Sequence, residues 1–277
     1  YGTVSPTSIR PDTGTPYGAD FPAATIRDTV ALHRLLLEHL GIRRVAMTIG
    51  GSMGGMQVLE WGFHPDLVGA LVPIGVGGRH SAWCIAWSEA QRQAIYADPN
   101  WKGGRYEAGE GPDGGLSAAR MMAMVSYRSR ASFESRFGRA RMAANEHQDV
   151  FAVESYLRYQ GEKLVQRFDA NCYVHLTRQM DSHDVSRGRG GYPDVLRSIR
   201  QPTLVIGIDT DVLYPVEEQE ELAAYMPDAT LQIIEAEHGH DSFLIAFEQL
   251  DEVLRPFMER VVAPAVGVPE AGVARSA

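Results

Sequence analysis

The sequence has little of what marks secreted, membrane-bound or nucleic-acid-binding proteins. Its 277 residues include only two cysteines, Cys84 and Cys172, so we expect no disulfide framework and a reducing, cytoplasmic compartment. No apolar run approaches the length of a membrane span, and no signal peptide opens the chain. Positive charge is in deficit: the net charge of −9 argues against nucleic acids and anionic membranes as partners.

The most informative segment present is a glycine-rich turn around Ser52. It follows the apolar run 45–49, precedes a helical pattern at 56–63, and reads Gly-x-Ser-x-Gly with glycines at 50 and 54. Strand, Gly-x-Ser-x-Gly and helix in this order are typical of a nucleophile elbow, which aims the serine hydroxyl outward from a strained turn. We expect the flanking glycines to permit a close backbone approach that a Cβ would block. A phosphate-binding loop is a poor alternative, because the Gly-Lys-Ser/Thr ending is missing.

Strand and helix patterns alternate at both ends of the chain. Apolar runs predict strands at 45–49, 70–76, 203–208 and 229–234, and periodicity predicts helices at 26–37, 56–63, 216–225 and 243–261. Apolar residues at 26, 30, 32, 35, 36 and 37 suggest one buried face of the first helix, which Thr25 could cap. Between about 78 and 200 strand patterns vanish and helical ones dominate, as at 116–137 and 150–180. That interval indicates an all-helical insertion between two buried strands.

The combined patterns predict an α/β fold of the α/β-hydrolase type with a helical lid inserted between sheet strands. Residues 1–77 and 201–261 form the core, 78–200 form the lid, and 262–277 form a disordered tail. The core is expected to be partial, because the residues before the elbow strand hold no convincing strand. Tyr1 is not an initiator methionine, so we expect a fragment or a processing product, with the N-terminal strands missing from this chain.

Two loops can complete a catalytic triad, which in this fold runs in the order Ser, acid, His. Asp209 and Asp211 follow the strand at 203–208; we favour Asp211, which sits within the loop, although either could be a simple loop aspartate. His238 and His240 follow the last strand, and we favour His240 because it follows a glycine and precedes the closing helix. A His-x-His pair could also bind metal, but no third ligand clusters with it, so we expect no metal site.

These residues together predict acyl chemistry. His240 takes the proton of Ser52, Asp211 holds the imidazole in the useful tautomer, and the serine attacks an acyl carbonyl. The Met53 N–H supplies one oxyanion donor. The second donor is expected from a loop after an earlier strand, which this chain does not hold.

The motifs extend beyond a generic hydrolase and resemble the homoserine O-acetyltransferase family. Residues 50–57 with 59–61 carry the resemblance at the elbow, and further matches reach from about Gly2 to Leu244. The matching segments are 80–83, 91–95, 98–101, 119–121, 126–129, 153–157, 167–171, 180–184 and 239–244.

The resemblance implies a ping-pong transfer in methionine biosynthesis, with no bound cofactor and acetyl-CoA as co-substrate. Ser52 would be acetylated, CoA would leave, and the hydroxyl of L-homoserine would attack the acyl-enzyme. By resemblance, Arg120 would hold the amino-acid carboxylate, Tyr127 would line the pocket, and Asp241 would pair with the ammonium group. From the residues alone, these three could equally be a solvated arginine, a core aromatic and a helix cap. A homodimer through the lid helices is also implied.

Several alternatives stay open at the level of sequence. The acceptor could be L-serine or deacetylcephalosporin C, which related enzymes acylate, and a simple esterase would use the same triad. The expected lack of N-terminal strands and of one oxyanion donor means either that a second chain completes the sheet or that the sequence is truncated. In the first case the chain would be active only with its partner.

Overall fold

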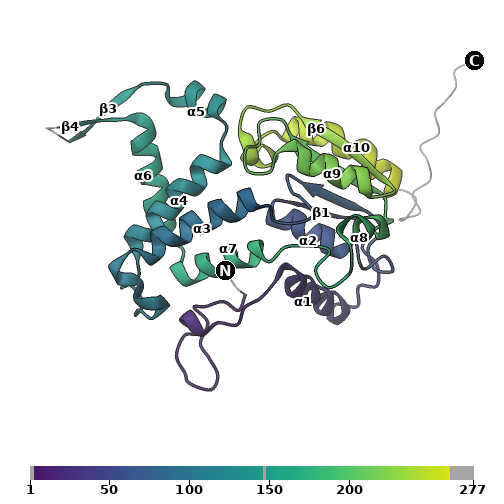
Figure 1. Ribbon diagram of the computed structural model, residues 1–277, viewed down its shortest axis with the longest axis horizontal. Coiled ribbons are helices and arrows are strands. Elements are labelled where there is room, and N and C mark those ends of the chain that lie inside the picture. Colours follow the sequence, from purple (N-terminus) through teal and green to yellow (C-terminus); the bar gives the residue numbers. More distant parts are fainter. Residues whose placement is uncertain (1–2, 146–147, 263–277) are drawn as a thin grey trace, which may run out of the picture.

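The structure, a computed structural model, describes residues 3–145 and 148–262 (Figure 1). Four strands form a parallel sheet in the order β1-β2-β5-β6. Their bounds are β1 Thr48–Gly51, β2 Leu71–Ile74, β5 Thr203–Ile208 and β6 Ala229–Ile234, so the last two match the predicted strands. The predicted tail lies outside the described residues, apart from Val262.

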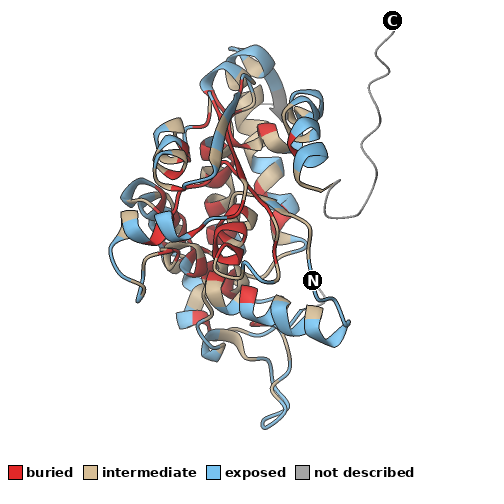
Figure 2. Ribbon diagram, turned by 90° about the vertical axis from the view of Figure 1, so that its right-hand side faces the viewer, coloured by how far each residue is buried: buried red, intermediate tan, exposed pale blue. Residues whose placement is uncertain are grey.

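Helices cover both faces of the sheet. Leu71 and Val205 pack in one core with α1 (Ile26–His39), α2 (Met53–Trp61), α8 (Tyr192–Ser198) and α9 (Val216–Tyr225). Val72 and Ile206 point the other way, into a second core with α10 (Phe247–Val261). Strands β2 and β5 are buried along their whole length, and buried residues follow the sheet through the centre of the molecule (Figure 2). This double coverage explains why those strands are apolar at every position.

The insertion is not all-helical, which corrects the prediction. Its helices are α3 (Ala82–Tyr96), η2 (Pro99–Gly104), α4 (Asp113–Tyr127), α5 (Arg130–Phe137), α6 (Ala152–Val165) and α7 (Ala170–Asp181). Between α5 and α6, β3 (Arg141–Asn145) and β4 (Gln148–Phe151) pair as an antiparallel hairpin, which protrudes at the far end of the lid (Figure 1). The helix expected at 116–137 is interrupted because Ser129 caps α5 by accepting from the Ser132 N–H.

The two ends of the insertion are joined by a short antiparallel contact. His80 N–H donates to His183 O at 2.8 Å, and Val185 N–H donates to Gly78 O at 3.0 Å. The following helix, α8, buries Val195 and Leu196 in the same core as α9. We therefore propose that the lid ends near Val185 and that α8 belongs to the core, whereas the sequence suggested a boundary at residue 200.

Two helices near the sheet differ from expectation. Helix α1 is capped by Thr25 as expected, but only Ile26 and Val30 are buried, while the leucines at 32, 35 and 36 are more than half exposed. At 100° per residue these leucines lie on a different side of the helix from Ile26. The helix therefore has one buried face, formed by Ile26, Val30 and the partly buried Leu37, and the prediction was wrong only in placing the leucines at 32, 35 and 36 on it. The closing helix begins at Phe247 rather than at 243, because Gly239–Leu244 forms a separate 3₁₀ turn, η3.

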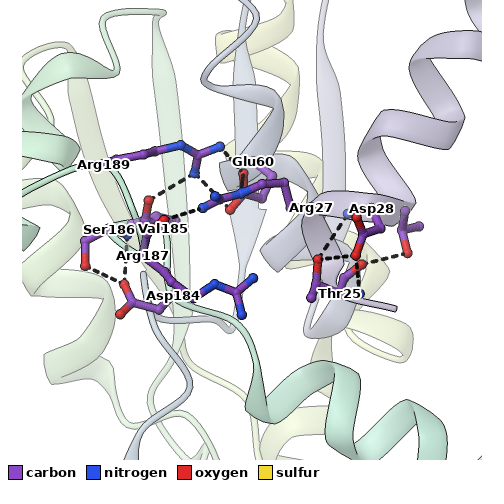
Figure 3. Close-up of polar contacts among 10 residues, drawn as sticks. Thr25, Arg27, Asp28, Glu60, Asp184, Val185, Ser186, Arg187 and Arg189 are labelled. Carbon is purple, nitrogen blue, oxygen red and sulfur yellow. Dashed lines mark hydrogen bonds and ion pairs between the residues drawn. The ribbon is translucent and has the colours of Figure 1, made fainter. Parts of the chain in front are cut away.

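A buried carboxylate connects the helix after the elbow to the exit of the lid (Figure 3). Glu60, on α2, is 3% exposed and receives two hydrogen bonds from Arg189 at 2.7 and 3.1 Å. The Arg189 guanidinium also stacks 3.6 Å from the centre of the Phe63 ring, and Arg27 of α1 lies 3.5 Å from the same carboxylate. The elbow helix is thereby attached to α1 and to the segment before α8.

Substituting Glu60→Gln should therefore destabilise the fold, because it leaves the Arg189 charge partly buried without a counter-charge. We expect a loss of about 3 kcal/mol, the usual range for breaking a buried pair, measured by urea unfolding. The matched control is Glu38→Gln, which removes the exposed ion pair with Arg34 and should cost well under about 1 kcal/mol. Equal losses in the two variants would contradict a special role for the buried pair.

Candidate active site

Ser52 lies on the strained turn that the sequence predicts. It joins β1 to α2 with φ 55° and ψ −123°, a backbone conformation that residues other than glycine rarely adopt. A Cβ on Gly50 would lie 2.6 Å from the backbone of Gly54, and one on Gly55 would lie 2.7 Å from Val76. A Cβ on Gly54 would meet no atom within 4 Å, so the close approach is required at Gly50 and Gly55 and not at Gly54.

Of the two candidate aspartates, Asp211 is the one that contacts a candidate histidine. Its side chain is buried in the loop after β5, and its Oδ1 accepts from the backbone N–H groups of Leu213 and Tyr214 at 2.8 and 2.9 Å. The other oxygen, Oδ2, lies 2.6 Å from Nδ1 of His240. Asp209 is exposed and accepts instead from the Ala236 N–H, which ties the end of β5 to the segment after β6. The two loops therefore meet through Asp211 and His240.

The His240 ring is enclosed at the carboxyl edge of the sheet. It is 3% exposed and lies within η3, with the rings of Tyr214, Phe243 and Tyr127 at centroid distances of 5.2, 5.5 and 6.0 Å. A Cβ on Gly75, at the end of β2, would lie 3.5 Å from the imidazole.

The second ring nitrogen of His240 and the serine share this edge. Ser52 N–H donates to Ile74 O at 2.9 Å, so the elbow is attached to the strand end that faces the imidazole. Nε2 of His240 is buried and has no hydrogen-bond partner among the described residues. With Nδ1–H donated to Asp211, Nε2 carries a free lone pair and can accept a proton.

The residues assigned by resemblance to acceptor binding lie near His240 and near one another. Arg120 and Tyr127 both lie on α4, with the guanidinium 5.7 Å from the centre of the Tyr127 ring. Asp241 follows His240 in η3 and does not cap the closing helix, whose N-cap is Ala246. Burial raises the pKa of Asp241, while the charges of Arg128, His240 and Arg120 lower it.

Sequence reasoning overlooked Arg128, which lies beside Tyr127 in a matching segment. Its Nε is 3.1 Å from Oδ2 of Asp241, and both side chains are mostly buried. The sequence shows only that a charged residue follows Tyr127 at the end of a helix. Such a pattern occurs in many proteins and does not identify the partner of an ion pair.

A buried chain of polar side chains behind Asp211 and His240 was also overlooked. Tyr214 packs its ring on His240, donates its N–H to Asp211, and brings its hydroxyl to 3.2 Å from Nδ1 of His80. Nε2 of His80 lies 3.6 Å from Asp181, whose other oxygen is 2.7 Å from Arg92. Burial lowers the pKa of His80 to about 3, so this histidine is neutral at physiological pH. Lid residues thus support the loop that carries Asp211.

In residues 3–145 and 148–262 no group of three or more His, Cys, Asp or Glu side chains is placed to hold a metal ion. No helix in that part of the chain is long and apolar enough to span a bilayer.

Comparisons with known proteins agree with this geometry. A family model described as alpha/beta hydrolase fold matches residues 4–246. The chain is 60% identical over 259 residues to homoserine O-acetyltransferase of Salinibacter ruber (strain DSM 13855 / M31), covering 92% of this chain and 73% of that protein.

Solved structures resemble the chain over the same span. Esterase E22 has a TM-score of 0.85 at 30% identity, covering 93% of this chain and 73% of that one. Homoserine O-acetyltransferase from Bacillus anthracis has a TM-score of 0.87 at 24% identity, covering 94% of this chain and 72% of that one, a likeness that shows the fold. The predicted fold class and resemblance are thereby confirmed, and the chain belongs to the homoserine O-acetyltransferase family within the α/β-hydrolase fold.

Proposed function

We propose that this protein transfers an acetyl group from acetyl-CoA to the hydroxyl of L-homoserine through an acetyl-Ser52 intermediate. The observation that carries the proposal is the 60% identity to a homoserine O-acetyltransferase over 92% of the chain. The pairing of Asp211 with His240, which leaves a free basic nitrogen beside the elbow, supports the chemistry.

In the first half-reaction Ser52 attacks the thioester. Nε2 of His240 takes the hydroxyl proton while Asp211, bonded to Nδ1, stabilises the imidazolium that forms. The new C–O bond forms as the C–S bond breaks, and the proton passes from Nε2 to the departing CoA sulfur. Negative charge on the carbonyl oxygen is stabilised by the N–H of Met53, the first residue of α2, for which the helix supplies no acceptor. The second oxyanion donor stays a prediction.

In the second half-reaction the acceptor hydroxyl attacks the acetyl-enzyme. His240 removes the hydroxyl proton and returns it to the Ser52 oxygen as the ester bond breaks. Arg120 suits a planar carboxylate, and Asp241 supplies the opposite charge for an ammonium group. Arg120 lies on α4 beside Tyr127, whose ring packs near His240, and Asp241 follows His240 in η3, so that their positions support the proposed roles.

A hydrolytic function is the second candidate. The observation that favours it is the similarity to esterase E22, at 30% identity over 93% of this chain. The same serine, histidine and aspartate would then release the acetyl group to water, so the two functions differ only in the fate of the acyl-enzyme.

L-Serine and deacetylcephalosporin C are alternative acceptors within the transferase chemistry. A homodimer through the lid, a cytoplasmic location and a requirement for a second chain remain proposals.

The first prediction concerns the intermediate. A pulse of acetyl-CoA should add one acetyl group to the chain, visible by intact mass, and L-homoserine should remove it with formation of O-acetylhomoserine. Ser52→Ala should abolish the adduct, because no other hydroxyl lies on the strained turn next to His240. Loss of the acetyl group to water at the same rate with and without homoserine would instead favour the esterase.

The second prediction concerns Tyr214. Tyr214→Phe keeps the ring against His240 but removes the hydroxyl that meets His80. Because His240 serves both half-reactions, both should slow by the same factor, about 3- to 10-fold for one lost hydrogen bond, when followed by rapid quench. The matched control is Tyr192→Phe, whose hydroxyl donates to Glu221 at 3.1 Å outside the catalytic pair. An equal loss in the control would contradict a role for Tyr214 in positioning His240.

A further inference from the structure

The junction between α4 and α5 in the lid contacts η3, the turn that carries His240, and the segment just before it. Ser129 Oγ donates a hydrogen bond to Glu237 O, and Nε of Arg128 lies 3.1 Å from Oδ2 of Asp241. Gly239 packs against the same junction: its φ is +68°, and a Cβ there would lie 2.6 Å from the Ser129 N. Three adjacent contacts therefore connect Arg128 and Ser129 to the turn that carries His240 and Asp241.

The ion pair within this junction is shielded from solvent. The exposed fractions of the Arg128 and Asp241 side chains are 19% and 18%. A carboxylate this buried is costly unless an opposite charge is close, and Arg128 is the cation in contact with it. Arg120, on α4, adds a second positive charge nearby.

We propose that Arg128 is a positioning residue of the acceptor site, whose guanidinium holds the Asp241 carboxylate in place to receive the ammonium group of the amino-acid acceptor. This inference rests on the proposed function, and it names a residue that determines specificity at the same site. Arg128 touches Asp241 and not the reacting atoms, so its effect passes through Asp241.

The placement of the two recognition groups explains why such a residue is needed. Arg120 belongs to the lid helix α4, whereas Asp241 belongs to η3 in the core. An amino-acid acceptor that bridges them is selected only if the lid and the turn keep a fixed separation. The Arg128 ion pair and the Ser129 hydrogen bond set that separation directly.

The two half-reactions depend on this arrangement differently. Acetylation of Ser52 by acetyl-CoA uses Ser52, His240 and Asp211 and requires no ammonium group at Asp241. Attack by homoserine on the acetyl-enzyme requires the contact between the ammonium group and Asp241. A change at Arg128 should therefore impair the second half-reaction and leave the first unchanged.

The test compares Arg128→Met and Arg128→Lys with the unmodified chain in both half-reactions. Arg128→Met should lower kcat/KM for L-homoserine about 10- to 100-fold, the order of loss expected when a binding group is displaced by about 1 Å. Acetylation of Ser52 by acetyl-CoA should stay within about twofold of the native rate, and Arg128→Lys should recover most of the loss, because it restores the charge. The control Arg158→Met removes an exposed ion pair with Glu154 on α6 and should change neither step.

Two further readouts separate positioning from a general structural defect. The acceptor 4-hydroxybutanoate, which lacks the ammonium group, should react equally with the native and Arg128→Met enzymes. In the variant, the acid limb of kcat/KM for homoserine should move to higher pH. Burial raises the pKa of Asp241 and Arg128 opposes this, so removing Arg128 raises that pKa further. Arg120 and His240 also lower the pKa of this carboxyl, and Asp211 raises it; all three stay in place.

The outcomes distinguish this proposal from the proposed function. If both half-reactions fall in proportion in Arg128→Met, or if neither falls, the role of Arg128 is overturned. If the native chain is not acetylated by acetyl-CoA, the proposed function fails instead. In that case the role of Arg128 is tested by calorimetric titration of L-homoserine into the native and Arg128→Met chains. Weaker binding by the variant supports the role of Arg128, and equal binding overturns it.

Discussion

The site depends on the buried contact between Asp211 and His240. Asp211 is held by two backbone N–H groups and His240 by the carboxylate itself, so neither side chain can turn without leaving a buried polar group unpaired. The contact also fixes which ring nitrogen is protonated. With Nδ1–H directed at Asp211, Nε2 is the basic nitrogen, and the enclosing rings keep it away from water. In the proposed mechanism the chemistry at Ser52 follows from that choice of tautomer.

The surrounding fold serves to hold this contact at one edge of the sheet. Because the strands are parallel, the loops after β1, β5 and β6 all emerge at the same edge of the sheet, which carries Ser52 on one loop and the contacting pair of Asp211 and His240 on the other two. The lid supports the Asp211–His240 pair through His80, which contacts the Tyr214 hydroxyl, whereas its junction at Arg128 contacts the neighbouring Asp241. We infer that the lid helps to orient the proposed catalytic and acceptor-binding groups.

Much of this arrangement was accessible from the sequence, for identifiable reasons. Strands β5 and β6 and helix α9 were predicted with their observed bounds, since uninterrupted apolar runs and clear turn residues mark them. The sequence favours Asp211 and His240, and in the structure these two side chains meet while Asp209 is exposed; their catalytic roles stay a prediction. The choice rested on the order Ser, acid, His along the chain, which this fold requires.

The misses have physical causes too. The hairpin of β3 and β4 was taken as helical because its sequence lacks the alternation of apolar and polar residues that predicts strands. The closing helix was started too early, since η3 has helical local geometry but a different hydrogen-bond pattern. The partner of Arg128 could not be found from sequence, because an ion pair between residues 113 positions apart depends on how the lid docks on the core.

The most direct test of the account is the tautomer of His240. Nitrogen NMR of the chain labelled with ¹⁵N-histidine, with His240 assigned by substitution, reports the protonation of each ring nitrogen. We predict that Nδ1 carries the proton and Nε2 is bare in the neutral ring, and that Asp211→Asn disturbs this state. A neutral ring with its proton on Nε2, or a spectrum that Asp211→Asn leaves unchanged, would contradict the central claim.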